Sequence, residues 1–489
     1  MKISRPHQAL FVFVCFLLAC AGLSAQQKPK ADPKYKSREQ DLIIDIPLTL
    51  TEITAINIFG NICWRLWGPD SEAAYFTLDS ISHNLNPGAW SWEAGLGGDT
   101  FLVNQLFHPF AGGFYFASAR SNNFNFYLSM LSPFLGSLQW ETFAETDMPA
   151  KNDLITTTSG GIVLGEILHR LYIELDKGGG AGKIGATILS PTDRITAALR
   201  GYGPEEGPNR IRSASLAFGV SWLYARFFEA SDETIYWKRP SVFADFDLVY
   251  DDPYTAHSKT PFDQFDLFIS LTLAIPQIYN LAFISNGYLA SWVLVDDEVS
   301  QASNGITMNF DCYVTDRGFT ELNNGRENLN FTASSLDYSI KWRRIINPSL
   351  ELSLKTHIGL SPWTVATYNG GENKDDYNLF SFGGNVKLFF ELREMKENSL
   401  MANGQSLTLS LCVFGTFFRL LNTPGFDNNA LFFSARIAYS LPLGNRFSFY
   451  AADNLLCLYC RPAGDAAAQF PDITRWYNNA QFGIKITFR

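Results

Sequence analysis

The feature that most constrains this chain is an alternation of apolar and polar residues with a period of two, which begins near Ser213 and continues to the C-terminus. Successive side chains of a β-strand point to opposite faces of the sheet, so this alternation gives each strand one apolar face and one polar face. The segment that begins at Leu350 shows the division. Its apolar residues are Leu350, Leu352, Leu354, Ile358 and Leu360, and its polar residues are Glu351, Ser353, Lys355 and His357.

About twelve segments of this kind follow one another, and bacterial transmembrane barrels have even numbers of antiparallel strands. The segments begin near Ser213, Val242, Gln264, Asn280, Gly305, Phe331, Leu350, Tyr377, Ser406, Leu431, Arg446 and Tyr477. Such a series predicts one large antiparallel sheet over residues 206–489.

The connections between the segments distinguish a barrel from a soluble β-sandwich, which would alternate in the same way. Residues 346–348 and 442–445 make tight turns, whereas residues 366–376 and 461–475 form long polar loops. Short turns at one end and long loops at the other are typical of an outer-membrane barrel. We expect the sheet to close, because an open edge in lipid would leave backbone N–H and C=O groups unpaired. The predicted fold class is an α+β membrane protein, with a mainly helical N-terminal domain followed by an antiparallel transmembrane β-barrel.

The last segment carries a recognisable ending. Gln481, Gly483, Ile486 and Phe488 resemble the C-terminal signal by which the assembly machinery recognises outer-membrane barrels, although Arg489 stands where that signal has an aromatic residue. We therefore predict localisation in the bacterial outer membrane, with outer-membrane lipid and the outer-membrane assembly machinery as partners.

The N-terminus predicts export. Lys2 and Arg5 form a positive region, and residues 9–19 form an apolar stretch of signal-peptide length. Cleavage after Ala25 is the favoured interpretation, and a lipoprotein box that ends at Cys20 is the alternative. Residues 1–25 are thus interpreted as a signal peptide, and residues 26–47, which are polar and rich in lysine, as a flexible linker.

Composition excludes several classes of protein. The net charge of −10 argues against a nucleic-acid partner. No apolar run after residue 25 is long enough for a typical spanning helix, although aromatic residues make up 15% of the chain. The pair Cys457 and Cys460 lacks two further ligands at a suitable spacing for zinc, so we interpret it as the end of a strand.

Residues 48–205 show a helical pattern interrupted by glycines, and they contain a series of spaced motifs. The motif residues are Asp99, Phe101, Asn104, Gln105, His108, Pro109, Gly112, Gly113, Tyr115, Ala119, Arg120, Ser137, Trp140, Glu141, Glu145, Pro149, Asn152, Asp153, Leu154, Gly160, Gly161, Gly165, Glu166 and Arg170. Their order and spacing, over about residues 50–200, resemble the uncharacterised bacterial family catalogued as domain of unknown function 3943. That family has no assigned activity, so the resemblance implies a domain and no reaction.

Two long helices are predicted in this domain. Residues 124–145 are expected to form a helix bent at Pro133. Residues 154–175 are expected to form a second helix, in which Gly161 and Gly165 lie on one face and let another backbone approach closely. Glu166 and Arg170 make an i,i+4 pair on it.

The ionisable residues of the domain are the candidate site. The candidate catalytic residues are His108, Glu141, Glu145, Asp153 and Glu166, with Arg120 and Arg170 as candidate ligand-binding residues. If these side chains converge, carboxylates beside a histidine can transfer protons or bind a cation. The competing interpretation is that they form ion pairs and helix caps, with Asp153 as an N-cap. His83, His169, His257 and His357 show no ligand spacing, so neither a metal nor a cofactor is predicted.

Three functions fit these patterns. The first is a structural or transport barrel with the helical domain as a lumen plug or periplasmic cap. Its lumen would be lined by Asp245, Asp247, Asp266, Asp311, Lys341, Lys355, Lys387, Arg436 and Lys485. The second is a membrane-bound enzyme that acts on lipid or envelope components through the polar residues of the helical domain, above all His108 and Glu141. The third, a surface adhesion protein, depends only on the long loops.

Overall fold

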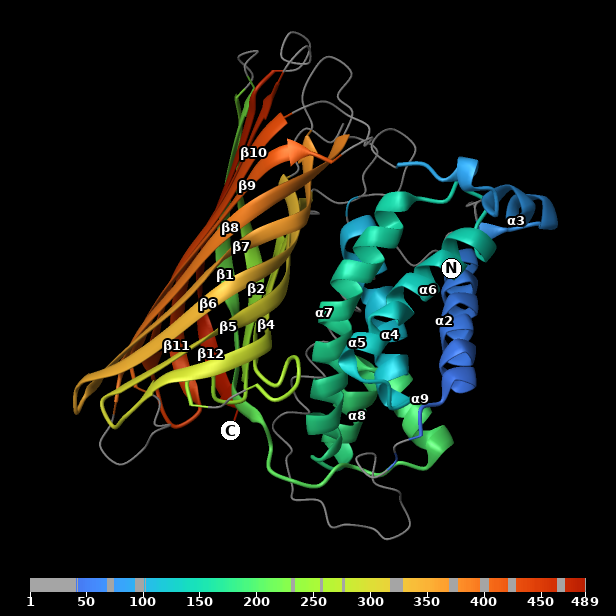
Figure 1. Ribbon diagram of the computed structural model, residues 1–489. Coiled ribbons are helices and arrows are strands. Elements are labelled where there is room, and N and C mark those ends of the chain that lie inside the picture. Colours follow the sequence, from blue (N-terminus) through green and yellow to red (C-terminus); the bar gives the residue numbers. More distant parts are fainter. Residues whose placement is uncertain are drawn as a thin grey trace. The chain divides into compact units, whose positions relative to one another are not determined.

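The computed structural model describes residues 41, 43–67, 74–92, 101, 103–229, 234–255, 258–274, 278–316, 329–368, 377–395, 404–420, 428–463 and 471–488. The expected signal peptide and most of the expected linker lie outside these residues. The described residues up to Arg210 form a helical unit, and those from Ile211 onward form a second unit made of strands. Each unit is described by itself (Figure 1).

The helical unit has the following elements in chain order. They are α2 (Ile46–Trp67), α3 (Leu78–Asn84), the 3-10 turn η2 (Pro87–Ala89), the π-helical turn η3 (Val103–Phe107), α4 (His108–Ser121), α5 (Phe126–Ser129), α6 (Leu131–Phe143), α7 (Lys151–Asp176), α8 (Gly180–Leu189) and α9 (Pro191–Arg200). Most of α7 is buried, and α4 and α6 pack against it. The second predicted helix is therefore confirmed and is longer than predicted.

Glycines allow α4 and α7 to touch at their backbones. A Cβ atom added to Gly161 would lie 2.6 Å from the Cα of Gly112, and one added to Gly112 would lie 2.1 Å from the carbonyl oxygen of Thr157. Gly165 meets the side chain of Phe116 in the same manner, at 2.5 Å. The predicted close approach of another backbone at Gly161 and Gly165 of α7 is confirmed. The helix that approaches is α4, at Gly112 and Gly113. Contacts of this kind are common between helices in membranes.

The predicted single helix over residues 124–145 is wrong in detail. The structure divides it into α5 and α6, with the break at Met130 rather than at Pro133. Pro133 lies in the first turn of α6. Backbone N–H groups in the first turn have no acceptor within the helix, so the N–H that proline lacks costs no hydrogen bond. Glu145 lies beyond the end of α6 and so does not share its helical face with Glu141.

Several helices of this unit bury polar side chains and expose apolar ones. In α2, Glu52, Asn57 and Asn61 are buried, whereas Phe59 is 68% and Leu66 is 71% exposed. A 21-residue stretch of this helix, from Ile46 to Leu66, has a mean hydropathy of 1.3 and only 28% of its most apolar window is buried. It is long and apolar enough to cross a membrane, by length and composition alone.

The same inversion recurs in α6 and α9. Ser132, Ser137, Glu141 and Thr142 of α6 are buried, whereas Leu131, Phe134, Leu135 and Phe143 are exposed. In α9, Thr192, Asp193 and Thr196 are buried, whereas Ile195 and Leu199 are exposed. A helix of a water-soluble domain shows the opposite arrangement.

The second unit is one closed antiparallel sheet in which every strand pairs with its neighbours in sequence and β1 pairs with β12 (Figure 1). The strands are β1 (Ile211–Glu229), β2 (Thr234–Tyr250), β3 (Phe265–Ala274), β4 (Ile278–Asp296), β5 (Ser300–Asp316), β6 (Leu329–Asn347), β7 (Leu350–Tyr368), β8 (Tyr377–Glu394), β9 (Ser406–Arg419), β10 (Asn428–Pro442), β11 (Phe447–Pro462) and β12 (Ile473–Phe488). The predicted closed barrel and its strand count are confirmed.

The two faces of the strands follow the predicted alternation. In β7, Ile358 is 57% and Leu360 is 55% exposed, while His357 is fully buried. In β12, Phe482 is 54% exposed and Gln481 is fully buried. The exposed face is apolar, whereas the inner face carries polar and charged side chains together with a buried aromatic cluster, so the outside of this sheet suits hydrocarbon.

The seam between β1 and β12 contains a contact between two glycines. Gly219 pairs with Gly483 in the register of the two strands. A Cβ atom added to Gly483 would lie 2.1 Å from the carbonyl oxygen of Phe218, and one added to Gly219 would lie 2.2 Å from that of Phe482. A side chain at either position would therefore force the strands apart at this level of the seam.

Candidate functional site

The inside of the barrel is filled by its own side chains. Phe331 of β6 stacks on Phe432 of β10 with ring centroids 4.6 Å apart, and Tyr313 of β5 also reaches Phe432, at 4.5 Å. These strands are not neighbours in the sheet, so the ring contacts cross the lumen. The rings belong to a buried apolar cluster that also contains Phe414 and Tyr368.

Ion pairs cross the lumen as well. Lys355 of β7 lies 2.9 Å from Asp266 of β3, and Arg436 of β10 lies 3.2 Å from Asp245 of β2. Lys387 of β8 pairs with Asp311 of β5, and both side chains are fully buried. The prediction that these residues face the interior is confirmed. Each of these charges pairs with an opposite charge on a strand that is not its neighbour. The paired side chains therefore extend across the lumen and fill part of it.

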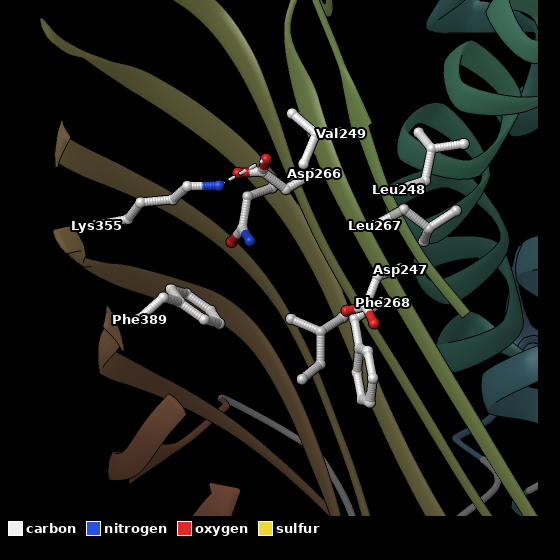
Figure 2. A pocket seen from close by; sticks show the side chains of 10 residues that line it. Asp247, Leu248, Val249, Asp266, Leu267, Phe268, Lys355 and Phe389 are labelled. Carbon is white, nitrogen blue, oxygen red and sulfur yellow. Dashed lines mark hydrogen bonds and ion pairs between the residues drawn. The ribbon is translucent and has the colours of Figure 1, made fainter. Parts of the chain in front are cut away.

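The described part of the barrel interior contains a small cavity. A cavity of about 140 Å³ lies beside the Lys355–Asp266 pair, and Figure 2 shows Asp247, Phe268 and Phe389 around it. A helix with its side chains is about 10 Å across. A cavity of this volume has no room for one.

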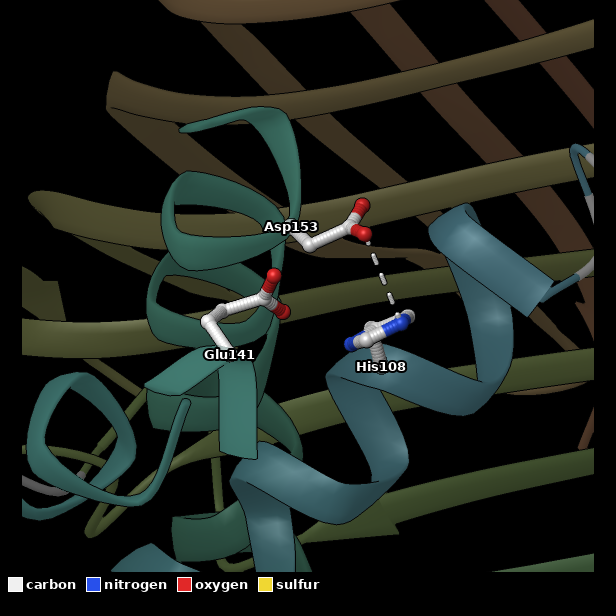
Figure 3. A group of neighbouring side chains, drawn as sticks. All are labelled: His108, Glu141 and Asp153. Carbon is white, nitrogen blue, oxygen red and sulfur yellow. Dashed lines mark ion pairs between the residues drawn. The ribbon is translucent and has the colours of Figure 1, made fainter. Parts of the chain in front are cut away.

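The helical unit contains a second polar site, formed by three of the candidate residues. His108 is the first residue of α4, Glu141 lies near the end of α6, and Asp153 lies in the first turn of α7. One ligand atom from each of these residues lies within 4.8 Å of the others (Figure 3). His108 Nε2 is 3.7 Å from Asp153 Oδ2. All three residues were candidates predicted from the sequence. They come from three different helices.

Hydrogen bonds hold each of these side chains. His108 Nδ1 lies 3.2 Å from Thr157 Oγ1. Glu141 Oε2 accepts a 2.8 Å hydrogen bond from the backbone N–H of Ala150, and Asp153 Oδ1 accepts a 2.7 Å bond from Asn152 Nδ2. The other oxygen of Glu141, Oε1, has no hydrogen-bond partner among the residues that the structure describes.

These bonds correct the prediction that Asp153 is the N-cap of α7. The N-cap position is occupied by Ala150, and its N–H is satisfied by Glu141 from a different helix. Asp153 lies three residues further on, in the first turn, where the helix dipole favours a negative charge.

Burial shifts the ionisation of two members of the site. It lowers the pKa of His108 to about 4. It also raises the pKa of Glu141 well above the ordinary range, and the nearby carboxylates of Glu145 and Asp153 raise it further. The neutral forms of the imidazole and of the Glu141 carboxyl are thereby favoured, and such a pair can accept and donate protons.

Of the remaining candidate residues, Glu145 lies beside Glu141 at this site, whereas Glu166, Arg120 and Arg170 form a separate group. Glu166 is fully buried and accepts hydrogen bonds from Arg120 Nε at 2.6 Å and Arg170 Nε at 2.8 Å. The predicted i,i+4 pair of Glu166 and Arg170 is confirmed, and Arg120 joins it from α4. Glu145 Oε2 accepts a hydrogen bond from Trp140 Nε1 at 3.1 Å.

A third polar group, around Glu52 of α2, was not predicted from the sequence. This buried carboxylate accepts hydrogen bonds from Ser118, Asn122 at 2.9 Å and Thr196 at 2.7 Å. The available signal was an acidic residue in an otherwise apolar helix.

Together these features define the class of protein. A closed barrel with an apolar exterior and a polar interior spans the bacterial outer membrane, and a helical unit with its own buried polar groups precedes it in the chain.

Residues 93–192 match the family described as Domain of unknown function (DUF3943). The match confirms the resemblance over a shorter range than the motifs suggested, and it includes His108, Glu141 and Asp153. No curated protein matches the chain.

Solved structures with weak similarity cover the barrel. The translocator domain of the autotransporter NalP from Neisseria meningitidis is 8% identical, with 57% of this chain and 88% of that chain covered and a TM-score of 0.23. The toluene transporter TodX of Pseudomonas putida is 6% identical, with 58% and 90% covered and a TM-score of 0.22. The KdgM porin is 8% identical, with 55% and 99% covered and a TM-score of 0.21. Similarities this low say nothing about a substrate.

Proposed function

We propose that the barrel is a closed anchor that holds the helical unit at the outer membrane and does not itself conduct solutes. The observation that carries this proposal is the set of contacts across the lumen, from the stacked rings of Phe331 and Phe432 to the Asp266–Lys355 pair. Water-filled channels lack such contacts between opposite walls. The role is therefore structural rather than one of transport.

The same filled lumen argues against the helical unit as a plug. A cavity of about 140 Å³ is much smaller than a bundle of helices. The exposed apolar side chains of α2, α6 and α9 argue against a cap that is surrounded by periplasmic water. The helical unit of this proposal contacts lipid through those helices. The 22 residues of α2 span about 33 Å, close to the thickness of a bilayer's hydrocarbon core.

Conductance measurements test the closed barrel. Purified full-length protein is added to a planar lipid bilayer, with an open porin as the positive control in the same lipid. We expect no stable conductance steps from the parent protein. Regular steps from the folded protein would contradict the proposal, whatever the position of the helical unit.

Photo-crosslinking tests the lipid contact. The photoreactive residue p-benzoyl-phenylalanine is placed at Ile58, which is 57% exposed on α2, or at Asp79, an exposed polar position of α3. In protein reconstituted into vesicles, Ile58 should form covalent adducts with lipid, detected by mass spectrometry, and Asp79 should form few. Equal and low yields at both positions would show that α2 does not contact lipid.

A second candidate function is an enzyme that acts on lipid or envelope components. The observation that favours it is the meeting of His108, Glu141 and Asp153, with the pKa of His108 and of Glu141 shifted toward the neutral forms. Strains that carry His108→Gln or Asp153→Asn should accumulate a lipid or envelope component that the parent strain converts. The exposed His83, changed to Gln, is the control. Identical lipid profiles in all strains would remove this candidate.

Recognition by the outer-membrane assembly machinery is a further part of the proposal. Gln481, Gly483, Ile486 and Phe488 all belong to β12, the closing strand of the barrel. Replacing Phe488 by Ser should lower the amount of folded barrel in outer-membrane fractions, and an unchanged amount would count against a signal at this position.

A further inference from the structure

We propose that His108, Glu141 and Asp153 bind a divalent first-row metal ion such as Zn²⁺. The proposal concerns binding by the helical unit, and it holds whether the barrel conducts or is closed. No metal was predicted from the sequence, because the histidines show no ligand spacing along the chain. Here one histidine and two carboxylates meet instead from three helices.

The geometry is near that of a coordination sphere. Zinc bonds to nitrogen and oxygen of about 2.1 Å place tetrahedral ligands about 3.4 Å apart. His108 Nε2 and Asp153 Oδ2 are 3.7 Å apart, and the three ligand atoms all lie within 4.8 Å of one another (Figure 3).

Each ligand is held by one atom and presents the other to the common centre. His108 uses Nδ1 toward Thr157, which leaves Nε2 directed at Asp153. Asp153 uses Oδ1 toward Asn152, and its Oδ2 faces the imidazole. Histidine ligands of metals usually make this kind of outer hydrogen bond, which fixes the ring and its tautomer.

The carboxylate of Glu141 gives independent support for a bound cation. Its side chain is fully buried, and Oε2 is bound to the N–H of Ala150. Oε1 has no hydrogen-bond partner among the described residues, and the carboxyl groups of Glu145 and Asp153 lie near that of Glu141, so negative charge gathers around it. A buried carboxylate oxygen without a partner is costly, and coordination of a cation would satisfy it.

The donor set also indicates the class of metal. Imidazole nitrogen favours zinc, iron, nickel or copper, and carboxylate oxygens favour manganese, magnesium or calcium. A mixed set of one nitrogen and two carboxylates therefore fits Zn²⁺ or Mn²⁺ better than Ca²⁺. The side chain of His108 is 14% exposed, so ions can reach the site, and three protein ligands leave a coordination position open for water or substrate.

Metal binding to the purified full-length protein in detergent tests the proposal. The purification tag is removed, the protein is treated with EDTA, and binding of Zn²⁺ and of Mn²⁺ is measured by calorimetry and by metal analysis after dialysis. We expect about one equivalent of at least one of the two ions in the parent protein and in His83→Gln. Asp153→Asn, which keeps the shape of the side chain, and His108→Gln should each lower the affinity at least about 100-fold.

A matched pair of threonines tests the outer hydrogen bond. Thr157→Val removes the partner of His108 and should weaken binding by about tenfold or more. Thr158→Val removes a hydroxyl that bonds to Leu154 O of its own helix, and it should leave binding unchanged. Circular dichroism confirms that each variant is folded. Absence of stoichiometric binding in the parent, or equal binding by folded Asp153→Asn, would overturn the proposal.

Discussion

The barrel and the helical unit both enclose polar side chains behind an apolar surface, but they achieve this in different ways. In the barrel, successive residues of each strand face opposite sides, so polarity alternates along the backbone. In α2, α6 and α9, polarity changes around the helix axis. The barrel interior is held by charge pairs and ring contacts between distant strands. The helices α4 and α7 touch at their glycines and are also joined by the Arg120–Glu166 pair. The barrel therefore fills a wide interior with long side chains, whereas the helical unit brings two backbones into direct contact.

The largest expected effect is in the barrel. Lys387→Met should lower the free energy of unfolding by about 4 kcal/mol, because it leaves the fully buried carboxylate of Asp311 without its cation. Urea unfolding in detergent, followed by tryptophan fluorescence, measures the change.

Arg393→Met is the matched control, because Arg393 is 46% exposed in its pair with Glu391. It should cost less than about 1 kcal/mol. The double variant Lys387→Met with Asp311→Leu should recover much of the lost stability, and failure to recover any would show that the charges are not coupled.

The next effect is in the helical unit. Gly161→Val should destabilise this unit by about 3 kcal/mol, because the added side chain collides with the backbone of Gly112. Limited proteolysis reports on the helical unit, and the heat-dependent shift of the barrel on gels reports on the barrel, which should stay folded. Gly180→Ala, where no atom lies within 4 Å of an added Cβ, should have little effect. Equal protease resistance of both variants would contradict the glycine contact.

A smaller effect depends on pH. Burial alone would raise the pKa of Glu166, but Arg120 and Arg170 offset this and leave the pKa below its ordinary value. The stability that Glu166 contributes is therefore fully present above its ordinary pKa and is lost as the pH falls through the lower folded value.

Glu166→Gln should accordingly cost about 2 kcal/mol at pH 7. The difference from the parent should shrink at pH values below about 4. Thermal unfolding followed by circular dichroism between pH 7 and pH 3 checks this, with the exposed Glu206→Gln as the control. If the difference in stability between the parent and Glu166→Gln grew on acidification, the direction assigned to the Glu166 pKa shift would be wrong.

The smallest effect is expected on the outer face of α2. Ile58→Ala should change the free energy of unfolding in detergent by less than about 0.5 kcal/mol, because detergent chains replace the lost contacts. Ile53→Ala on the same helix should cost at least about 2 kcal/mol, because Ile53 is only 2% exposed and the change leaves a cavity. The same measurement compares the two variants. Equal losses would show that the apolar face of α2 packs against protein.

The barrel could be predicted because its pattern is local. Residues two apart share a face, and that rule alone locates the strands. The start of β2 was missed, since the structure places it at Thr234 and the prediction placed it near Val242. Lys238, Arg239 and Pro240 interrupt the alternation there. The pairing of β2 with β1 continues through them nonetheless.

The site in the helical unit could be predicted only in part, because its geometry depends on how helices dock. The spacing of Glu166 and Arg170 identified their ion pair within one helix. Nothing in that spacing indicates that Arg120 binds Glu166 or that His108 meets Asp153, since these partners lie on different helices. Glu52 was missed for the same reason, because its partners Ser118 and Thr196 are distant in the chain.

The glycine contact between Gly219 and Gly483 has a consequence for biosynthesis. Gly219 lies in β1 and Gly483 lies in β12, so the cylinder closes only where these two strands pair. Until the second arrives, the first keeps an open edge whose backbone groups cannot be satisfied in lipid. A polypeptide that lacks β12 therefore cannot complete the cylinder.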